Sequence, residues 1–334
     1  LSCLHGNVYM IWKLNGAIID NKTAIIIYGK QSISIEKCKY SEEVLNFLRL
    51  AEKGIEEDNL LIYNENSRIN VLIKALKKRS LFIKFENTYV DTVLDKSYYF
   101  LNYFLGNQYN IVSLLTFNKH ITILGCGGVG ANVSLNLLLA GFLNLTLIDY
   151  DVVEHSNLNR QFPLNNGDVG ELKVDALRKH LLSYVPNAQI AVINKQISST
   201  GSLLDILHVT DLIVCGIDTP PIKSQLFAAE AAYTKDTPII FSGVGYESIM
   251  VGPFLTTNQA TGSYIKRLKG LDDDCINTNP ITGSLPSTNA ILSSIVSNEI
   301  IGFFYKTHIG ISINKQVVIN PFNLGMKVIE YYES

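Results

Sequence analysis

Short apolar runs, separated by polar turn residues, occupy the start of the chain. Residues 8–16, 23–29 and 32–36 are rich in Ile, Val and Tyr, and turn-forming residues lie between them at 18–21 and 30–31. Runs of β-branched and aromatic residues bounded by such turns are typical of strands. We therefore expect a small antiparallel sheet in this segment.

Apolar positions three and four residues apart replace this pattern after residue 40. Residues 41–52 and 67–79 follow the spacing closely, and residues 55–62 follow it more weakly. Such spacing predicts amphipathic helices. The run SLFIKF then predicts an edge strand. A sheet followed by three helices is the layout of a winged-helix module, an α+β fold that we expect over residues 1–86.

Strands that alternate with helices begin at His120, after a Tyr- and Phe-rich segment, residues 87–118, that we expect to be a helical connector. The elements expected in the alternating region are strands at 121–124, 145–149, 189–193, 211–216 and 238–242, helices at 130–140, 173–184 and 222–233, an antiparallel strand IMVGPFL, an irregular stretch at 256–286, a helix at 287–304, and strands at 317–319 and 326–329. This alternation predicts a doubly wound, Rossmann-like, mostly parallel α/β sheet over residues 119–334.

The composition of the chain limits which partners and which cellular compartment are expected. Hydrophobic residues make up 47% of the 334 positions and charged residues 17%, which suits a globular protein with a large core. The net charge of −2 argues against nucleic acid as a partner, because there is no excess of cations to neutralise phosphates. The longest apolar stretches, such as residues 133–147, are interrupted by Asn and Gly, which argues against a membrane span. We expect a cytoplasmic protein that contacts neither nucleic acid nor membrane.

A glycine-rich turn separates the first strand of the alternating region from its helix. Gly125, Gly127 and Gly130 have the spacing G-x-G-x-x-G, and Gly128 lies within it. Small residues there let backbone amides approach a phosphate at the N-terminus of a helix. The motif is shared with dinucleotide-binding dehydrogenases and does not identify a reaction. Asp149, about twenty residues on, has the position of a carboxylate that takes the ribose hydroxyls of an adenine nucleotide, which narrows the ligand to an adenosine.

The segment after Asp149 separates an adenylating enzyme from a dehydrogenase. The string LIDYDVVEHSNLNRQF, followed by DVGELKV, resembles the signature of the ThiF/MoeB/ubiquitin-activating family. By this resemblance Arg160 and Lys173 clamp the triphosphate of ATP, and Asp218, at the end of DLIVCGID, binds Mg²⁺. The residues that the resemblance adds to the nucleotide site are Asp151, Asn157 and Gln161, of which the last two orient the loop that carries Arg160.

An adenylation site needs fixed cations. Attack on the α-phosphorus places negative charge on the non-bridging oxygens and on the departing pyrophosphate, and cations stabilise that transition state more than the ground state. Hydride transfer has no need of Arg160 and Lys173 in this stretch. We therefore expect Arg160, Lys173 and Asp218 to be the catalytic residues, with ATP and Mg²⁺ as cofactors.

Departures from the family pattern change some expectations. Many relatives bind a structural zinc through two C-x-x-C pairs, whereas this chain has no such pair and no cysteine after Cys275, so we expect no zinc. Several relatives place an arginine before the nucleotide domain that reaches the partner subunit's ATP site, and here Lys96 or another cation would replace it. Three aspartates before Cys275 raise a thiol pKa, so a bystander is favoured over a thioester cysteine. His155 and His180 are expected to be surface or helix residues.

The N-terminal module resembles the PqqD-like peptide-recognition element, with a generic winged-helix dimerisation or packing module as the alternative. Such a module fused directly to an adenylating domain looks most like the enzymes that modify ribosomal peptides during natural-product maturation. The resemblance implies a homodimer and a short ribosomal precursor peptide, adenylated at a carboxylate or a terminal amide with release of pyrophosphate. Two alternatives stay open: adenylation of the C-terminal glycine of a ubiquitin-like sulfur carrier, and a nonenzymatic scaffold that binds leader peptides.

Overall fold

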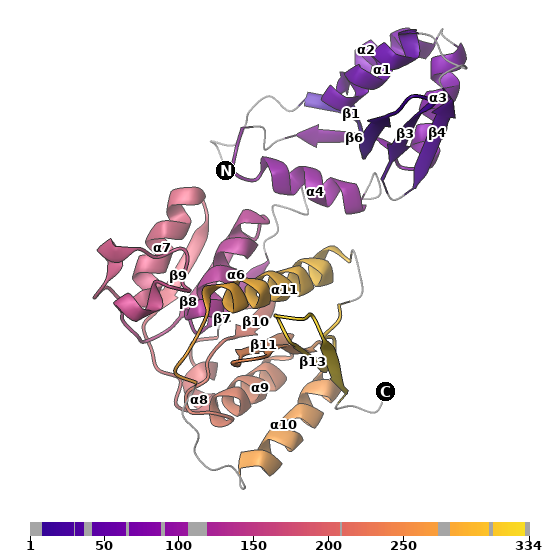
Figure 1. Cartoon of the computed structure of the whole chain (residues 1–334). Helices are drawn as coiled ribbons and strands as arrows, with labels where there is room; N and C mark the ends of the chain where they lie inside the picture. The colour runs from indigo at the N-terminus through magenta and orange to yellow at the C-terminus, as the bar shows by residue number, and fades with distance from the viewer. Residues whose placement is uncertain are drawn as a thin grey trace. The chain divides into compact units, whose positions relative to one another are not determined.

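The computed structural model of the chain is shown in Figure 1. It describes residues 9–29, 31–36, 42–64, 67–87, 91–105, 119–207, 209–272, 281–306 and 310–330. The chain divides into two compact units, Leu1–Thr116 and Phe117–Ser334. Each unit has a hydrophobic core of its own.

Two small sheets and a group of helices make up the N-terminal unit. Its strands are β1 (Tyr9–Leu14), β2 (Ala17–Asp20), β3 (Ala24–Tyr28), β4 (Ser32–Glu36), β5 (Ile55–Glu56) and β6 (Phe82–Asn87). Its helices are α1 (Glu42–Lys53), α2 (Glu57–Leu61), α3 (Ser67–Lys78) and α4 (Asp95–Leu105). The fully buried rings of Phe47 on α1 and Phe82 on β6 meet edge-on, with centroids 5.8 Å apart. Aromatic packing therefore joins a helix to a sheet in this core.

The strand pairing of this unit differs from the one antiparallel sheet expected from the sequence. β1 pairs with β5 and β6, whereas β2, β3 and β4 form a second sheet. The turn expected at residues 18–21 is also wrong, because most of these residues belong to β2 and the turn begins at Asn21. The Asn21 Oδ1 atom accepts hydrogen bonds from the backbone N–H groups of Thr23 and Ala24, at 2.9 and 2.7 Å, and so stabilises the reversal there.

An eight-stranded sheet organises the C-terminal unit, in the order β14-β13-β12-β11-β10-β7-β8-β9. Its parallel strands are β7 (His120–Leu124), β8 (Asn144–Ile148), β9 (Gln189–Ile193), β10 (Leu212–Cys215) and β11 (Ile239–Val244). Its antiparallel strands are β12 (Ile249–Leu255), β13 (Lys315–Ile319) and β14 (Met326–Glu330). The predicted doubly wound, Rossmann-like, mostly parallel fold is confirmed, and IMVGPFL runs antiparallel as expected.

Helices cover both faces of this sheet (Figure 1). They are α6 (Gly128–Leu139), α7 (Lys173–Tyr184), α8 (Thr200–Leu204), α9 (Lys223–Lys235), α10 (Asn258–Asp272) and α11 (Pro286–Tyr305). α6 packs against α7 and α11, and α9 packs against α8 and α10. Among the described residues, no helix is both long enough and apolar enough to cross a membrane.

Helix α10 lies where the sequence predicted an irregular stretch, residues 256–286, and that prediction is wrong for Asn258–Asp272; residues 273–280 of the stretch lie outside the described residues. Ala260, Tyr264 and Leu268 are buried at a spacing of four residues and join the core that α9 also enters. Close packing there is helped by fully buried small residues of α9, namely Ala228, Ala229, Ala231 and Ala232. The spacing is a helix signal, but the many polar residues and two glycines of NQATGSYIKRLKGLD conceal it.

The order of the strands reverses at β7. β8 and β9 lie on one side of β7, and β10 and β11 lie on the other. The loops that follow β7 and its neighbours therefore diverge at the carboxyl edge of the sheet. In open α/β sheets this point forms the crevice where ligands bind.

Candidate active site

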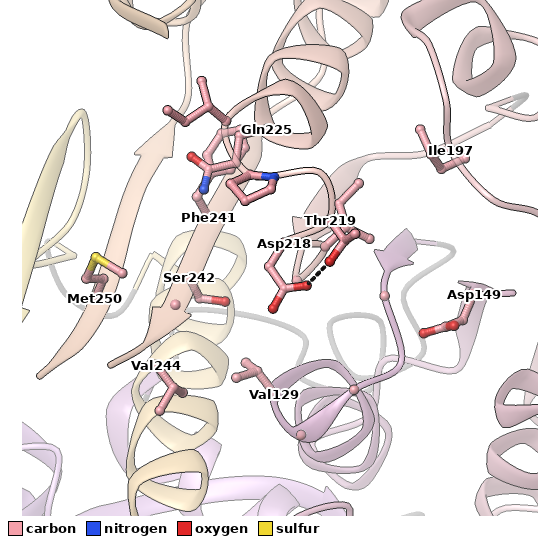
Figure 2. Close-up of a pocket in the computed structure, with 18 of the residues that line it drawn as sticks. Val129, Asp149, Ile197, Asp218, Thr219, Gln225, Phe241, Ser242, Val244 and Met250 are labelled. Carbon is pink, nitrogen blue, oxygen red and sulfur yellow. Dashed lines mark hydrogen bonds between the residues drawn. The ribbon is translucent and has the colours of Figure 1, made fainter. Parts of the chain in front are cut away.

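A cavity of about 680 Å³ lies at the carboxyl ends of β7, β8, β10 and β11 (Figure 2). Its volume is in the range that small-molecule ligands occupy. The predicted site residues that line it are Gly125, Gly127, Gly128, Asp149, Asp151, Arg160, Gln161, Lys173 and Asp218. The other two predicted residues, Gly130 and Asn157, are not among the described residues that line the cavity. They support the residues that do. The topology thus brings together residues that are almost a hundred positions apart in sequence.

The glycine-rich turn has room for a ligand only because its glycines lack side chains. Gly125 has a positive φ of 88°, and a Cβ atom on it would lie 2.9 Å from the backbone of Gly216. A Cβ atom on Gly130 would lie 1.9 Å from the Gly125 carbonyl oxygen. By contrast, the same position on Gly127 meets nothing within 4 Å. The turn therefore packs tightly on its inner side and is open toward the cavity at the N-terminus of α6, as a phosphate cradle requires.

The Asp149 carboxylate is held against the glycine-rich turn. Its Oδ2 atom accepts a hydrogen bond from the Cys126 backbone N–H at 2.6 Å, and its Oδ1 atom accepts one from the Asp151 backbone N–H at 2.9 Å. Charge-assisted bonds to two backbone donors fix the side chain at the end of β8. This is a suitable position from which to accept hydrogen bonds from the two hydroxyls of a ribose.

Two buried thiols flank the site. Burial raises the pKa of the Cys126 thiol well above its ordinary value, and the Asp149 carboxylate raises it further. Burial also raises the pKa of the Cys215 thiol to about 12. Neutral thiols are poor nucleophiles, so these two cysteines are packing residues. Cys275 lies outside the described residues.

Lys173 is a cation held at the cavity wall. It is the first residue of α7, its side chain is only 10% exposed, and its Nζ atom lies 2.7 Å from Asp151 Oδ2. The backbone N–H of Lys173 also donates to the Asp151 carbonyl oxygen at 2.9 Å. These two contacts fix both the main chain and the ammonium group, so Lys173 presents its charge to the cavity with little freedom to move.

Arg160 and Gln161 come from the loop between β8 and α7. The Arg160 Nη1 atom donates to the Ser156 carbonyl oxygen at 2.8 Å and to Asn159 Oδ1 at 2.9 Å. Gln161 is only 1% exposed, and its Oε1 atom has no hydrogen-bond partner among the described residues. A buried acceptor without a donor is costly, and a polar ligand in the cavity would satisfy it.

Asn157 shapes the start of this loop from behind the cavity wall. It is 6% exposed, and its Oδ1 atom accepts a hydrogen bond from the Glu154 backbone N–H at 3.2 Å. The Glu154 side chain in turn caps the short 3₁₀ helix His155–Asn157. This reciprocal cap fixes the start of the loop that leads to Arg160.

Asp218 lies just beyond β10, between the other strand ends. Its Oδ1 atom accepts a hydrogen bond from Thr219 Oγ1 at 3.2 Å, and Figure 2 shows the carboxylate facing the cavity between Asp149 and Ser242. No group of three or more His, Cys, Asp or Glu side chains that would hold a metal occurs in the described chain. A single carboxylate together with ligand phosphates suits Mg²⁺, which keeps several water ligands.

No role for Asn132 was predicted from the sequence. This residue links α6, the helix that follows the glycine-rich turn, to the loop that carries Arg160. Asn132 is 6% exposed, and its Nδ2 atom donates to the carbonyl oxygens of Gly128 and Arg160 at 2.7 and 2.8 Å. Its Oδ1 atom accepts from the Phe162 backbone N–H at 3.1 Å. One amide therefore fixes the backbone on either side of Gln161. A buried polar residue in an apolar helix is the only signal of this role in the sequence.

We predict that Asn132→Ala weakens nucleotide binding more than it weakens folding. The substitution leaves the buried acceptors of Gly128 and Arg160 with fewer donors and frees the loop, so the Kd for ATP should rise about tenfold, which corresponds to about 1.4 kcal/mol. Calorimetric titration with ATP measures this. Asn136→Ala, on the same helix but away from the cavity, is the matched control, and equal ATP affinities for the two variants would contradict the assignment.

Asp168 links the loop before α7 to the second half of that helix, and His180 is one of its partners. The Asp168 carboxylate is buried, and it contacts Lys179 Nζ at 2.7 Å, His180 Nε2 at 2.6 Å and the Asn165 backbone N–H at 2.8 Å. Burial raises the pKa of Asp168, but the bonds from Lys179, Asn165 and His180 outweigh it and leave the pKa below its ordinary value. His180 is thus a helix residue, as expected, with a specific partner.

This lowered pKa predicts how stability depends on pH. A carboxyl group with a lower pKa in the folded state stabilises the fold above its unfolded pKa, and that contribution disappears as the pH falls through the folded pKa. Asp168→Asn should therefore reduce the free energy of unfolding by about 2 kcal/mol at pH 7. The difference between the variant and the unmodified protein should shrink below about pH 4. Urea unfolding between pH 7 and pH 3 tests this, and a difference independent of pH would contradict it.

A phosphate cradle, a carboxylate at the end of β8 and two fixed cations around one cavity define a nucleotide-binding protein of the doubly wound α/β class. The model of the ThiF family matches residues 114–331. The chain belongs to the ThiF family.

Relatives in sequence match this chain over only part of their length. The NEDD8-activating enzyme E1 catalytic subunit of Drosophila melanogaster is 36% identical over 117 residues, which is 35% of this chain and 25% of that protein. The Caenorhabditis elegans subunit of the same name is 33% identical over 106 residues, which is 32% of this chain and 24% of that protein. The matched region is thus about a quarter of these relatives.

Similar solved structures match most of the chain. The Escherichia coli MccB structure with ATP has a TM-score of 0.74 at 19% identity and covers 97% of this chain and 98% of its own. The structure of PaaA has a TM-score of 0.65 at 20% identity, over 81% of this chain and 95% of its own. At these identities the similarity establishes a shared fold.

Proposed function

We propose that this protein adenylates a ribosomally made peptide with ATP, at a carboxylate or a terminal amide, and releases pyrophosphate. The observation that carries the proposal is the arrangement around one cavity of the Asp149 carboxylate, the cations of Arg160 and Lys173, and the Asp218 carboxylate. Such a set would supply a ribose site, a triphosphate site and a magnesium site. A dehydrogenase would need only the ribose site.

The proposed step is a substitution at the α-phosphorus. An oxygen of the substrate carboxylate forms a bond to that phosphorus, the bond to the bridging oxygen of the β-phosphate breaks, and its electron pair leaves with pyrophosphate. Asp149 would orient the ribose, while Lys173 and Arg160 would bind the charge that develops on the phosphate oxygens. Mg²⁺, held by Asp218 when ATP is bound, would neutralise further phosphate charge.

The peptide substrate is supported by the extent of the structural similarity. Structures of MccB, which are described with the peptide MccA, match both units of this chain. We propose residues 1–86 as the peptide-recognition module, residues 87–118 as a helical connector and residues 119–334 as the adenylating domain. A leader segment would dock on the module by adding a strand to one of its sheets, a common mode of peptide recognition.

We also propose a homodimer, with Lys96 of one subunit as a candidate for the cation that serves the partner's site. Lys96 is almost fully exposed on α4, where its only ion pair among the described residues is with Asp95 at 3.3 Å. An exposed pair of this kind is weak and is easily exchanged for a phosphate. Light scattering at micromolar concentration should give the dimer mass.

Mass spectrometry with ATP, magnesium and the short peptide encoded beside the gene tests the proposal. A mass gain of one AMP shows stable adenylation, and loss of water from the peptide shows that adenylation is a transient activation. Exchange of labelled pyrophosphate into ATP should depend on the peptide in either case. The absence of both a mass change and exchange would refute the proposed reaction.

The sequence relatives support a second candidate, the activation of a ubiquitin-like protein at its C-terminal glycine, including a sulfur carrier. Their names describe NEDD8- and SUMO-activating enzymes. Deletion of residues 1–86 separates the candidates, because it should abolish peptide adenylation and leave carrier activation intact. A third candidate, a nonenzymatic scaffold, requires that calorimetry detect no binding of ATP with magnesium.

A further inference from the structure

The cavity has a second half beyond Asp218 that none of the predicted site residues explains. Figure 2 shows Asp149 on one side of Asp218, and Phe241 and Met250 on the other. The wall of this second half comes from α9, α10 and strands β11 to β13, and it includes Gln225, Phe241, Met250, Tyr264, Arg267 and Gln316. A nucleotide oriented by Asp149 would leave this half available for a second substrate.

Contacts with the neighbouring helices α8 and α9 fix the position of helix α10, so α10 presents a defined surface to the cavity. Its Lys269 Nζ atom lies 2.8 Å from Glu230 Oε1 on α9, and Thr200 Oγ1 on α8 donates to Glu230 Oε2 at 2.6 Å. Burial raises the pKa of Glu230, but the bonds from Lys269 and Thr200 outweigh it and leave the pKa below its ordinary value. One ionised carboxylate thus links α8, α9 and α10.

Tyr264 of this helix fixes the amide of Gln225. Its hydroxyl donates to Gln225 Oε1 at 3.0 Å, and its 5% exposed ring packs on Phe241 with centroids 5.0 Å apart. With its oxygen held by Tyr264, the amide presents its NH₂ group. In the described part of the chain no acceptor is paired with Gln225 Nε2. The amide therefore offers hydrogen-bond donors to a ligand of the cavity.

Ser242 adds a second donor close to Asp218. Its Oγ atom is buried on the cavity wall and has no hydrogen-bond partner among the described residues. Ser242 follows a register shift between β11 and β12, opposite a stretch that contains Gly252 with a positive φ of 82°. Irregularities of this kind redirect side chains and are frequent beside active sites. The unpaired hydroxyl is therefore a candidate ligand contact rather than a packing feature.

We propose that this half of the cavity is the acceptor subsite, and that it binds a chain end through the terminal carboxylate or carbonyl oxygen. This assignment rests on the proposed adenylation. Gln225 Nε2 and Ser242 Oγ would both donate hydrogen bonds to that acceptor group, and Arg267 at the exposed rim favours negative charge. Phe241 and Leu268 on the wall favour an apolar side chain on the last residues of the substrate.

Introducing a negative charge at Gln225 tests the subsite. Glu at this position still accepts the Tyr264 hydrogen bond, but it replaces the N–H donors with a negative oxygen. In pyrophosphate exchange with short synthetic peptides that differ in their last residue, each as free carboxylate and as carboxamide, Gln225→Glu should raise the peptide KM at least tenfold. The KM for ATP should not change. Gln259→Glu, an exposed position at the start of α10, is the matched control.

Two further variants keep the test decisive. Tyr264→Phe retains the ring on Phe241 but releases the Gln225 amide, and Ser242→Ala removes one donor; each should raise the peptide KM several-fold without lowering the melting temperature. An unchanged peptide KM in all three variants, or an equal rise in the KM for ATP, overturns the subsite alone. If the unmodified protein binds ATP but exchanges with none of the peptides, the proposed function fails and the subsite fails with it.

Discussion

Lys173→Met is expected to reduce kcat for peptide-dependent pyrophosphate exchange about a thousandfold, with a much smaller effect on folding. The Lys173 ammonium is nearly enclosed and is paired with Asp151 at 2.7 Å, so its charge acts at the cavity wall with little screening by water. Removing one preorganised group that binds transition-state charge typically costs a factor of about 10² to 10³. Methionine preserves the length and packing of the side chain. The Asp151 carboxylate, which would lose its ion pair with Lys173, stays hydrated because its side chain is 45% exposed.

Exchange kinetics and thermal unfolding, measured together, test this expectation. Arg178→Met removes a cation from the exposed side of the same helix and should leave kcat unchanged. Asp151→Asn should have an intermediate effect, since it releases Lys173 without removing the charge. A kcat for Lys173→Met within threefold of the unmodified protein, with the fold intact, would exclude Lys173 from the transition state.

The features that the sequence predicted well have local signals. Each strand of the parallel sheet is a short apolar run, and the glycine spacing of residues 125–130 marks the turn after the first of them. α7 spans Lys173–Tyr184, as its apolar spacing predicts, and Asp149 and Asp218 could be placed at strand ends from the sequence alone. Because the carboxyl ends of parallel strands lie along one edge, these local predictions sufficed to bring the residues together.

The features that were missed depend on contacts between distant segments. Asn132 is polar within an apolar helix, and its role appears only when Arg160, from a later loop, lies against it. The pairing of β1 with β6 joins the first and last strands of the N-terminal unit, which no short pattern encodes. The cavity face of α10 likewise depends on its packing against α9. Residues that position other residues, such as Asn132, were therefore predicted less often than residues that belong to a recognisable motif.

Asp218→Asn is expected to abolish most magnesium-dependent activity while leaving the cavity intact. Asn keeps an oxygen that can accept the Thr219 hydrogen bond, which measures 3.2 Å to Asp218 Oδ1, so the loop after β10 should retain its conformation. It removes the negative charge, and Mg²⁺ binds carboxylate oxygens in preference to neutral amides. We expect kcat/KM for exchange to fall at least a thousandfold and the magnesium concentration for half-maximal rate to rise.

Two controls distinguish the loss of a metal ligand from a general disturbance of the site. Asp205→Asn changes an exposed carboxylate just after α8 and should have no effect, whereas Thr219→Val removes the hydroxyl but keeps the Asp218 charge and should cost a few-fold. Binding of ATP without magnesium should be the same in Asp218→Asn and in the unmodified protein, because Asp149 and the glycine-rich turn are unchanged. If exchange persists in Asp218→Asn with an unaltered magnesium dependence, the metal must be held by another carboxylate, and Asp151, which also lines the cavity, is then the residue to replace.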